Sequence, residues 1–171
     1  MTSNPNRLTC SLLSNGAGRY AFIHYDEAAG TLTAKANIAQ SSFPSALSGL
    51  SVSQMSQAIL DESCSLMRYG NQVYTISQNG LTSTNFGSGI LASSSDLQYL
   101  VSGTMLYKYS SSANSYAQFT TLTSYSSYFI KSSSNKIVVW GASAVPSGSK
   151  YTVDQTVYAI LDNSGSANAF Y

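Results

Sequence analysis

The hydrophobic positions of this chain recur mostly at every second residue, in short runs separated by polar turns. Residues 72–78 show the pattern clearly and end at Asn79-Gly80, a strong turn dipeptide. A hydrophobic period of two is typical of a β-strand. We therefore predict strands at residues 19–25, 31–38, 72–78, 97–100, 105–109, 116–122, 128–131, 136–140 and 152–161.

Turns rich in Gly, Asn, Asp and Ser separate the predicted strands. Residues 26–30 join the first two strands as a hairpin, because Gly30 can supply the positive φ that such a turn needs. Residues 132–135 join two later strands in the same way, and residues 162–165 end the last one. Most of the chain is therefore expected to form antiparallel hairpins.

Residues 51–69 depart from this pattern. Their apolar residues recur at roughly helical spacing, at Val52, Met55, Ile59, Leu66 and Met67. Ser51 and Gln54 have the spacing of a capping box, and Gly70 suits the position after a helix end. We predict one amphipathic helix here that packs on a sheet, with a partner-binding helix as the alternative.

Two predicted strands, at residues 19–25 and 137–140, are apolar or aromatic on both faces. One face of an antiparallel sheet usually meets water, so such strands are central in the fold or covered by another subunit. The chain length and hydrophobic content suit one domain over residues 1–171. We predict a mainly β fold: an antiparallel β-sandwich or barrel of short strands with one amphipathic helix at about residues 51–69.

A propeller is an alternative, because an aromatic strand recurs four times along the chain. The recurring tyrosines are Tyr20, Tyr74, Tyr107 and Tyr158. Their spacing is irregular, and no second residue is expected to repeat in register with them. Propeller blades usually span about 40–50 residues, so 171 residues barely allow four blades. We therefore prefer a sandwich or a barrel.

The composition is low in charge and rich in tyrosine. Charged residues make up 9% of the chain, against about 25% in an ordinary soluble domain. The chain has 13 tyrosines and a formal net charge of +1, with no cluster of Lys or Arg. Direct nucleic-acid binding is not expected without a basic patch. Tyrosine is enriched at interfaces, so the composition favours a protein that contacts copies of itself or a sugar.

Cys10 and Cys64 are the only cysteines. Pairing is open to them, but two cysteines in a chain of this size are not a disulfide framework, and we favour two separate thiols. The N-terminal residues lack the pattern of a signal peptide, and no apolar run approaches the ~18–20 residues of a membrane span. We expect no transmembrane segment and a location in a virion, or in the cytoplasm before assembly.

His24 and Asp26 lie on the same face of a predicted strand, where a His–Asp pair beside a serine could activate a nucleophile. No Gly-x-Ser-x-Gly elbow accompanies them, and we interpret His24 as a strand-end residue near turn carboxylates. Asp61 and Glu62 are adjacent, and adjacent residues do not face each other on a helix. We expect both to be solvated.

Other catalytic or metal sites have little support in the sequence. Asp96 and Asp154 sit beside apolar strands and are the remaining carboxylates considered for a glycosidase-type pair. Cys64 lies late in the predicted helix, where the helix dipole opposes a thiolate, so we expect a small buried apolar residue. A glycine-rich segment at residues 85–89 lacks the Lys-Ser/Thr of a phosphate loop. We predict no metal, no cofactor and no enzymatic activity.

The strongest candidate site is a cluster of aromatic residues interleaved with serine. Its members are Tyr107, Tyr109, Tyr116, Tyr125, Tyr128 and Trp140. Aromatic faces with hydroxyl and amide donors suit both a polar subunit interface and a neutral sugar. An ordinary strand core that leaves some rings exposed is the third interpretation.

We therefore predict a non-enzymatic structural or assembly subunit, of the virion coat, fibre or surface-appendage type. It would pack through Tyr- and Ser-rich β faces as a homo-oligomer or larger assembly. A carbohydrate-binding, lectin-like module is the alternative, with glycans as partners. Both predictions rest on composition and on analogy at the level of the fold.

Overall fold

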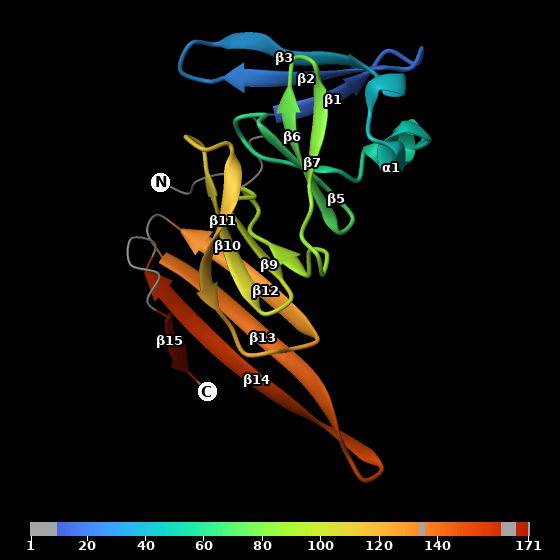
Figure 1. Ribbon diagram of the computed structural model, residues 1–171. Coiled ribbons are helices and arrows are strands. Elements are labelled where there is room, and N and C mark those ends of the chain that lie inside the picture. Colours follow the sequence, from blue (N-terminus) through green and yellow to red (C-terminus); the bar gives the residue numbers. More distant parts are fainter. Residues whose placement is uncertain (1–9, 134–135, 162–166, 171) are drawn as a thin grey trace. The chain divides into compact units, whose positions relative to one another are not determined.

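The computed structural model describes residues 10–133, 136–161 and 167–170, and most of them lie in antiparallel strands (Figure 1). The strands form four sheets, and within each sheet neighbouring strands follow one another along the chain. Consecutive antiparallel strands need only short turns, which the many Gly, Asn and Ser residues supply. The predicted mainly β fold is confirmed.

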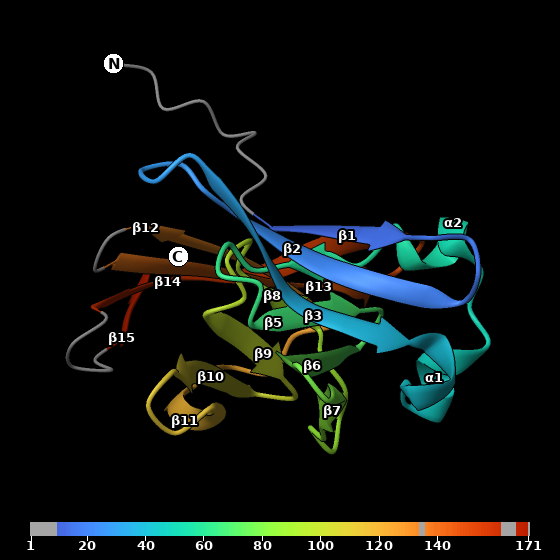
Figure 2. The same cartoon turned by 90° about the horizontal axis from the view of Figure 1, so that it is seen from above.

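Two sheets belong to a compact unit that ends at Thr84. The first sheet contains β1 (Cys10–Ser14), β2 (Arg19–Asp26) and β3 (Thr31–Ala39). The second sheet contains β4 (Ile59–Leu60), β5 (Leu66–Tyr69), β6 (Gln72–Ser77) and β7 (Gly80–Thr84). Between them lie the 3-10 helix η1 (Gln40–Ser42) and the short helices α1 (Ser45–Ser48) and α2 (Val52–Met55). Figure 2 shows α1 following the end of β3.

The other two sheets belong to the unit that begins at Asn85. One contains β8 (Ala92–Ser93), β9 (Tyr99–Ser102), β10 (Met105–Ser110) and β11 (Ser115–Thr121). The other, the C-terminal sheet, contains β12 (Ser127–Ser133), β13 (Lys136–Ser147), β14 (Lys150–Leu161) and β15 (Ala167–Phe170).

Each unit has a core of its own between its two sheets. In the first unit, Phe22 of β2 belongs to one buried cluster with Tyr74 of β6. In the second, Leu106 of β10 belongs to one cluster with Val139 of β13 and Tyr158 of β14. Two sheets that bury their facing side chains make a sandwich, and the described strands close no barrel. The assignment of residues 1–171 to a single domain stays a prediction.

The helix predicted over residues 51–69 is wrong beyond its first turn. It begins as expected, because Ser51 and Gln54 form a capping box. It ends at Met55, however, and β4 and β5 occupy the rest of the segment. Leu66 and Met67 are both 0% exposed. Adjacent residues point to opposite faces of a strand, so both faces of β5 are buried here, whereas a surface helix would bury a single stripe.

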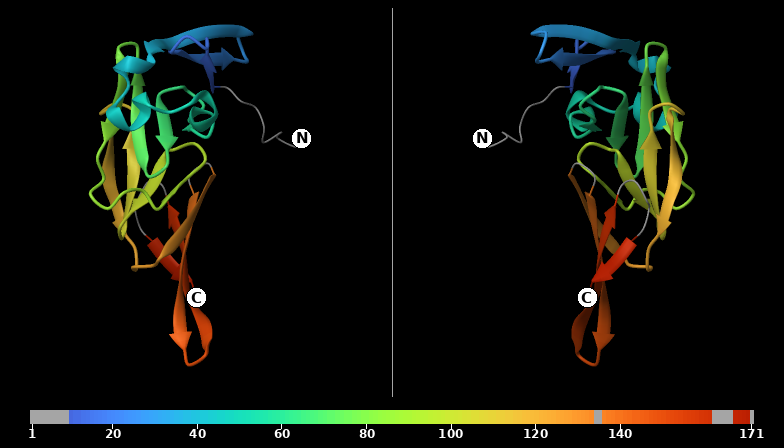
Figure 3. Two further views of the ribbon diagram at one scale, coloured as in Figure 1. Left: turned by 90° about the vertical axis from the view of Figure 1, so that its right-hand side faces the viewer. Right: turned by 90° about the vertical axis from the view of Figure 1, so that its left-hand side faces the viewer.

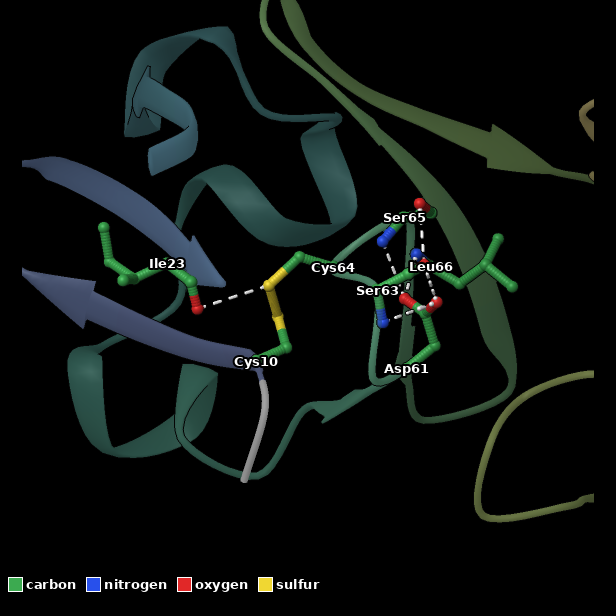
Figure 4. Close-up of a disulfide and its surroundings, with 7 residues drawn as sticks. All are labelled: Cys10, Ile23, Asp61, Ser63, Cys64, Ser65 and Leu66. Carbon is green, nitrogen blue, oxygen red and sulfur yellow. Dashed lines mark hydrogen bonds between the residues drawn. A yellow bond between two sulfur atoms is a disulfide. The ribbon is translucent and has the colours of Figure 1, made fainter. Parts of the chain in front are cut away.

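Cys10 and Cys64 form a disulfide, and the prediction of two separate thiols is wrong (Figure 4). The bridge joins the start of β1 to the β4–β5 turn, with a Cα–Cα distance of 5.3 Å. The linked residues are 54 positions apart, a separation for which loop-closure entropy predicts about 4 kcal/mol of stabilisation. The number of cysteines in a sequence can indicate a framework of several disulfides. It does not reveal a single disulfide between two cysteines that only the fold brings close enough to bond. Such a bridge is typical of proteins that mature outside a reducing cytosol.

Asp61 is 4% exposed, which contradicts its expected place in solvent. Its carboxylate accepts hydrogen bonds from the backbone N–H groups of Ser63 at 3.3 Å, Ser65 at 2.7 Å and Leu66 at 2.6 Å, and from the Ser63 hydroxyl. These bonds satisfy peptide donors of a tight turn in which Cys64 has a φ of 57°. The buried carboxylate therefore shapes the turn that presents Cys64 for bridging (Figure 4).

The strands β8, β9 and β10 repeat the bounds of β4, β5 and β6 at an offset of 33 residues. Tyr107 matches Tyr74, and Gly103 matches Gly70, each glycine with a φ of 58° in the turn that follows the middle strand. The expectation that no second residue repeats in register is wrong for these two sheets. The repeat lies mainly in backbone conformation, which leaves few identical letters in the sequence.

Most predicted strands are confirmed, with ends that move by one or two residues. The prediction at residues 136–140 is too short, because β13 continues to Ser147 through Gly141 and Pro146, residues that usually interrupt a strand. The strands β1, β4, β5, β7, β8 and β15 were not predicted. The turn predicted at residues 162–165 and half of the loop at residues 132–135 lie outside the described residues.

The strands β13 and β14 extend beyond their neighbours as a two-stranded arm, defined as residues 143–154 (Figures 1 and 3). In the described part of the chain, β12 pairs with β13 only as far as Ala142, and β15 pairs with β14 only from Val157. At the tip, Ser147 pairs with Lys150 across a two-residue turn in which Gly148 has a φ of 60°. Within residues 10–133, 136–161 and 167–170, no helix is long and apolar enough to cross a membrane.

Candidate functional site

The two faces of the C-terminal sheet differ sharply in burial although both are apolar. On β13, Ile137 and Val139 point toward the core and are buried, while Val138 and Trp140 point away from it and are exposed. This alternation follows from the strand period of two. The sequence placed apolar residues on both faces, and the second unit covers one of them.

The exposed side of this sheet is called the outer face. The strand register places on it Ser127, Phe129, Lys131, Lys136, Val138, Trp140, Ala142, Ala144, Pro146, Tyr151, Val153, Gln155, Val157 and Ala159. Phe129 lies opposite Trp140, which lies opposite Val157 on the next strand. Further along, Ala144 lies opposite Val153. The outer face is therefore a mainly apolar surface that runs from β12 onto the arm, with Lys131 and Lys136 at the end away from the arm.

Trp140 stands at the edge of a hollow in the outer face. The hollow has a volume of about 590 Å³, and Ser127, Ala142, Val153 and Gln155 contribute to its lining. Trp140 Nε1 donates a hydrogen bond to Gln155 Oε1 at 3.1 Å. This bond fixes the indole ring across the strands while leaving the side chain 45% exposed. The hollow thus combines an oriented aromatic ring with polar groups.

Serines hold the end of β12 against β13 beside this hollow. The Ser126 N–H donates to Ser143 Oγ at 2.7 Å, and the Ser126 and Ser127 hydroxyls both donate to the Ala142 carbonyl, at 3.2 and 3.0 Å. The Ser143 hydroxyl accepts in this arrangement, so its own proton is available to a further acceptor. The rim of the hollow therefore presents serine hydroxyls that hydrogen bonds hold in place.

Tyr125 and Tyr128, two of the six predicted contact residues, face the inner side of the C-terminal sheet. The Tyr125 hydroxyl is buried and lies 2.5 Å from Thr156 Oγ1. The Tyr128 hydroxyl donates to the Thr123 carbonyl at 2.6 Å and accepts from the Tyr125 N–H at 2.9 Å. Burial raises the pKa of Tyr128 above its ordinary value. Both rings brace the loop before β12.

The other three predicted tyrosines lie on the β10–β11 hairpin. Tyr107 and Tyr116 contact the ring of Phe86 edge-on, at centroid distances of 4.9 and 5.5 Å. The Tyr109 hydroxyl donates to Asn114 Oδ1 at 2.7 Å, and the Tyr116 hydroxyl donates to the Leu97 carbonyl at 2.6 Å. These contacts give all three an intramolecular role. A role for them in partner contacts stays a prediction.

The structure thus places one predicted contact residue, Trp140, on the outer face, among apolar neighbours that were not singled out. Phe129, Tyr151 and Val153 are large, exposed and on the same face. The signal for them was present in the sequence, since residues 137–140 are apolar on both faces. It could not be extended to the arm, because the length of β13 was underestimated.

The candidate catalytic residues have structural partners. Asp26 Oδ1 accepts from the N–H groups of Ala28 and Ala29, at 3.0 and 3.1 Å, and so caps its turn. His24 is half-buried on β2, opposite Cys10. The described residues contain no group of three or more His, Cys, Asp or Glu that could hold a metal ion. The absence of enzymatic activity stays a prediction.

Asp96 and Asp154 do not share a cleft. Asp96 accepts hydrogen bonds from Ser94 Oγ at 2.5 Å and Ser132 Oγ at 3.2 Å, near the end of β12. Asp154 lies in the arm, beyond the start of the same strand. A glycosidase needs its carboxyl groups about 5–10 Å apart, and this arrangement does not provide that.

No protein-family model matches this chain, and a search of curated proteins finds no significant match.

Proposed function

We propose that this protein is a non-enzymatic structural subunit of an ordered assembly, of the virion coat, fibre or surface-appendage type. In this proposal the outer face of the C-terminal sheet is the packing surface. The observation that carries it is the apolar character of both faces of one sheet, of which the second unit covers one. An exposed apolar face of this kind marks an interaction site in soluble proteins.

The exposed apolar area is large enough to support association. Phe129 is 59% exposed, Trp140 45% and Tyr151 75%. With about 150–250 Å² for each aromatic side chain, these three leave roughly 350 Å² of apolar surface in water. The exposed valines of the outer face raise this to about 500 Å², close to the largest patch of a typical monomer. The serines, alanines and Gln155 around it extend the surface toward the ~800 Å² that a stable interface buries on each partner.

The charge distribution also favours dense packing of copies. With 15 charged side chains of nearly balanced sign among 171 residues, neighbouring subunits experience little electrostatic repulsion. The outer face adds hydroxyl and amide groups at its rim, as interfaces usually do. Its two lysines, Lys131 and Lys136, lie at the end away from the arm, so burying the rest of the face desolvates no charged side chain.

Trp140 provides an internal probe, because it is the only tryptophan. Its fluorescence quenching by acrylamide should be measured over a concentration series of the native protein. We expect strong quenching in dilute solution and shielding at high concentration, as copies cover the indole ring. Quenching that stays the same at every concentration would count against the outer face as the packing surface.

A Val138→Asp variant is the control for this measurement. It introduces a charge next to Trp140 on the exposed side of β13, where the side chain has no core contacts to lose. We expect Trp140 in this variant to stay accessible to acrylamide at the concentrations that shield it in the wild type. Equal shielding in both proteins would place the contact elsewhere.

A carbohydrate-binding module is the second candidate, and the hollow beside Trp140 favours it. An aromatic ring fixed by Gln155 and bordered by serine hydroxyls suits stacking and hydrogen bonding with a neutral sugar. This function predicts saturable quenching of Trp140 by a glycan, with little dependence on salt. A glycan array without binding would remove this candidate.

A further inference from the structure

One edge of the arm is open for strand pairing. Among the described residues, β14 has a pairing partner on the β15 side only from Val157 onward, so the stretch from Lys150 to Thr156 has a free backbone edge. An isolated two-stranded ribbon is marginally stable in water, and an open edge is a template for another strand. On the other side of the arm, β13 carries Pro146, which lacks a backbone donor and discourages pairing.

The free edge is chemically self-complementary. Its sequence is Lys150, Tyr151, Thr152, Val153 and Asp154. If two such strands pair antiparallel around a two-fold axis at Thr152, Lys150 of each copy faces Asp154 of the other. Tyr151 faces Val153, and Thr152 faces itself. Opposite charges, an aromatic with a β-branched residue, and two threonines are all favourable cross-strand pairs.

We propose that the partner of the arm is a second copy of this chain, and that the two β14 edges pair antiparallel around Thr152. This inference rests on the proposed function, for which it specifies the partner and the register. It joins two C-terminal sheets into one continuous sheet. Because Tyr151 and Val153 lie on the outer face, the pairing also joins the two outer faces into one apolar surface.

The charges of Lys150 and Asp154 show whether the β14 edge is built to pair with another strand or to prevent such pairing. A lysine alone on an edge strand is a common device against aggregation, because it places a charge where another strand would dock. Here Asp154 lies at the position that neutralises Lys150 in the two-fold register, and both side chains are exposed. The edge therefore rejects other strands while accepting a copy of itself.

Charge reversal tests the register directly. Lys150→Asp places two aspartates opposite each other at both ends of the pairing, and Asp154→Lys places two lysines there. Each single variant should raise the dimer dissociation constant about tenfold or more, as measured by sedimentation velocity. An equimolar mixture of the two variants, and the double variant K150D/D154K, should restore dimerisation. Single variants that dimerise like the wild type would overturn the proposal.

A cysteine cross-link provides the second test. Residues opposite each other in antiparallel strands have Cα atoms about 4.5–5.5 Å apart, within the range of a disulfide. The described chain has no free cysteine, so Thr152→Cys should give a covalent dimer under mild oxidation. Ser149→Cys, at the exposed arm tip, is the matched control and should stay monomeric on a non-reducing gel. Equal cross-linking of both variants would contradict the register.

The two proposals fail in different ways. Suppose that Val138→Asp abolishes assembly, that both charge variants assemble like the wild type, and that Thr152→Cys forms no covalent dimer. The outer face then packs without β14 pairing, and only this inference is wrong. If the charge variants dissociate the dimer and Val138→Asp changes nothing, copies associate through the edge alone. The outer face then loses its role as the packing surface.

Discussion

The inner and outer faces of the C-terminal sheet are both largely apolar but have different surroundings. Val139 is 0% exposed and packs in the core of the second unit, while its neighbour Val138 is 41% exposed. The inner face is required for the unit to fold, because it buries β12–β14 against β8–β11. The outer face contributes little to that core. Its apolar residues are therefore best explained by a contact that forms after folding.

The sharpest test of this difference is a charge at each of the two adjacent valines. Val139→Asp buries an unpaired carboxylate and should destabilise the protein by about 4 kcal/mol or more. Val138→Asp should change the free energy of unfolding of the monomer by less than about 0.5 kcal/mol. Urea denaturation followed by circular dichroism measures both. Similar losses at the two positions would mean that the outer face is part of the folding core.

Adding one heavy atom to a side chain on each face should give a smaller difference in stability between the two faces. A Cβ on Gly141 would overlap the ring of Tyr125, which the hydrogen bond to Thr156 holds in place. Gly141→Ala should therefore cost about 1–3 kcal/mol of stability by overpacking. Ala142→Ser adds one atom on the outer side and should be close to neutral. Thermal unfolding of both variants checks this, and a neutral Gly141→Ala would show that the ring can move aside.

On the inner face, the hydroxyls of Tyr125 and Thr156 form a buried pair. Removing the two hydroxyls should change the free energy of unfolding in a non-additive way. Tyr125→Phe leaves Thr156 Oγ1 without its partner at 2.5 Å and should cost about 1–2 kcal/mol. Thr156→Val should do the same from the other side. The double variant should be less destabilised than the sum of the two, because no polar group is left unpaired. A double-mutant cycle with purely additive losses would argue against the pair.

The smallest expected effect is a pH dependence at Tyr128. Burial raises the pKa of this phenol in the folded protein. The resulting stability is fully present below the unfolded pKa of about 10 and is lost as pH rises through the folded value. Tyr128→Phe should therefore lose less stability than the wild type on going from neutral to alkaline pH. Parallel pH profiles of the two proteins would show no contribution from this group.

The sequence predicted the class of the fold because strand periodicity and turn residues are local signals. The hairpin of residues 19–38 and the turn at Gly80 follow from them directly. The segment after Met55 could not be predicted in this way. There the disulfide, the buried Asp61 and pairing with β6 override a helical spacing of apolar residues, and all three depend on distant parts of the chain.

The candidate site was only partly visible in the sequence for a related reason. Trp140 was singled out by its residue type, and its hydrogen bond to Gln155 depends on a strand pairing. The tyrosines of β10 and β11 have the same residue type but bond within their own unit. Composition identifies residues suited to an interface, while strand register decides which of them face outward.

The most direct test of the account is the native mass of the untagged protein by light scattering over a concentration series, beside Val138→Asp. We predict a defined multimer or a growing polymer for the wild type and, for the variant, a shift to species no larger than the β14-paired dimer of two 18.2 kDa chains. A wild type that stays monomeric at high concentration would contradict assembly through the outer face. The exposed face would then serve a foreign ligand, with the hollow beside Trp140 as the first place to look.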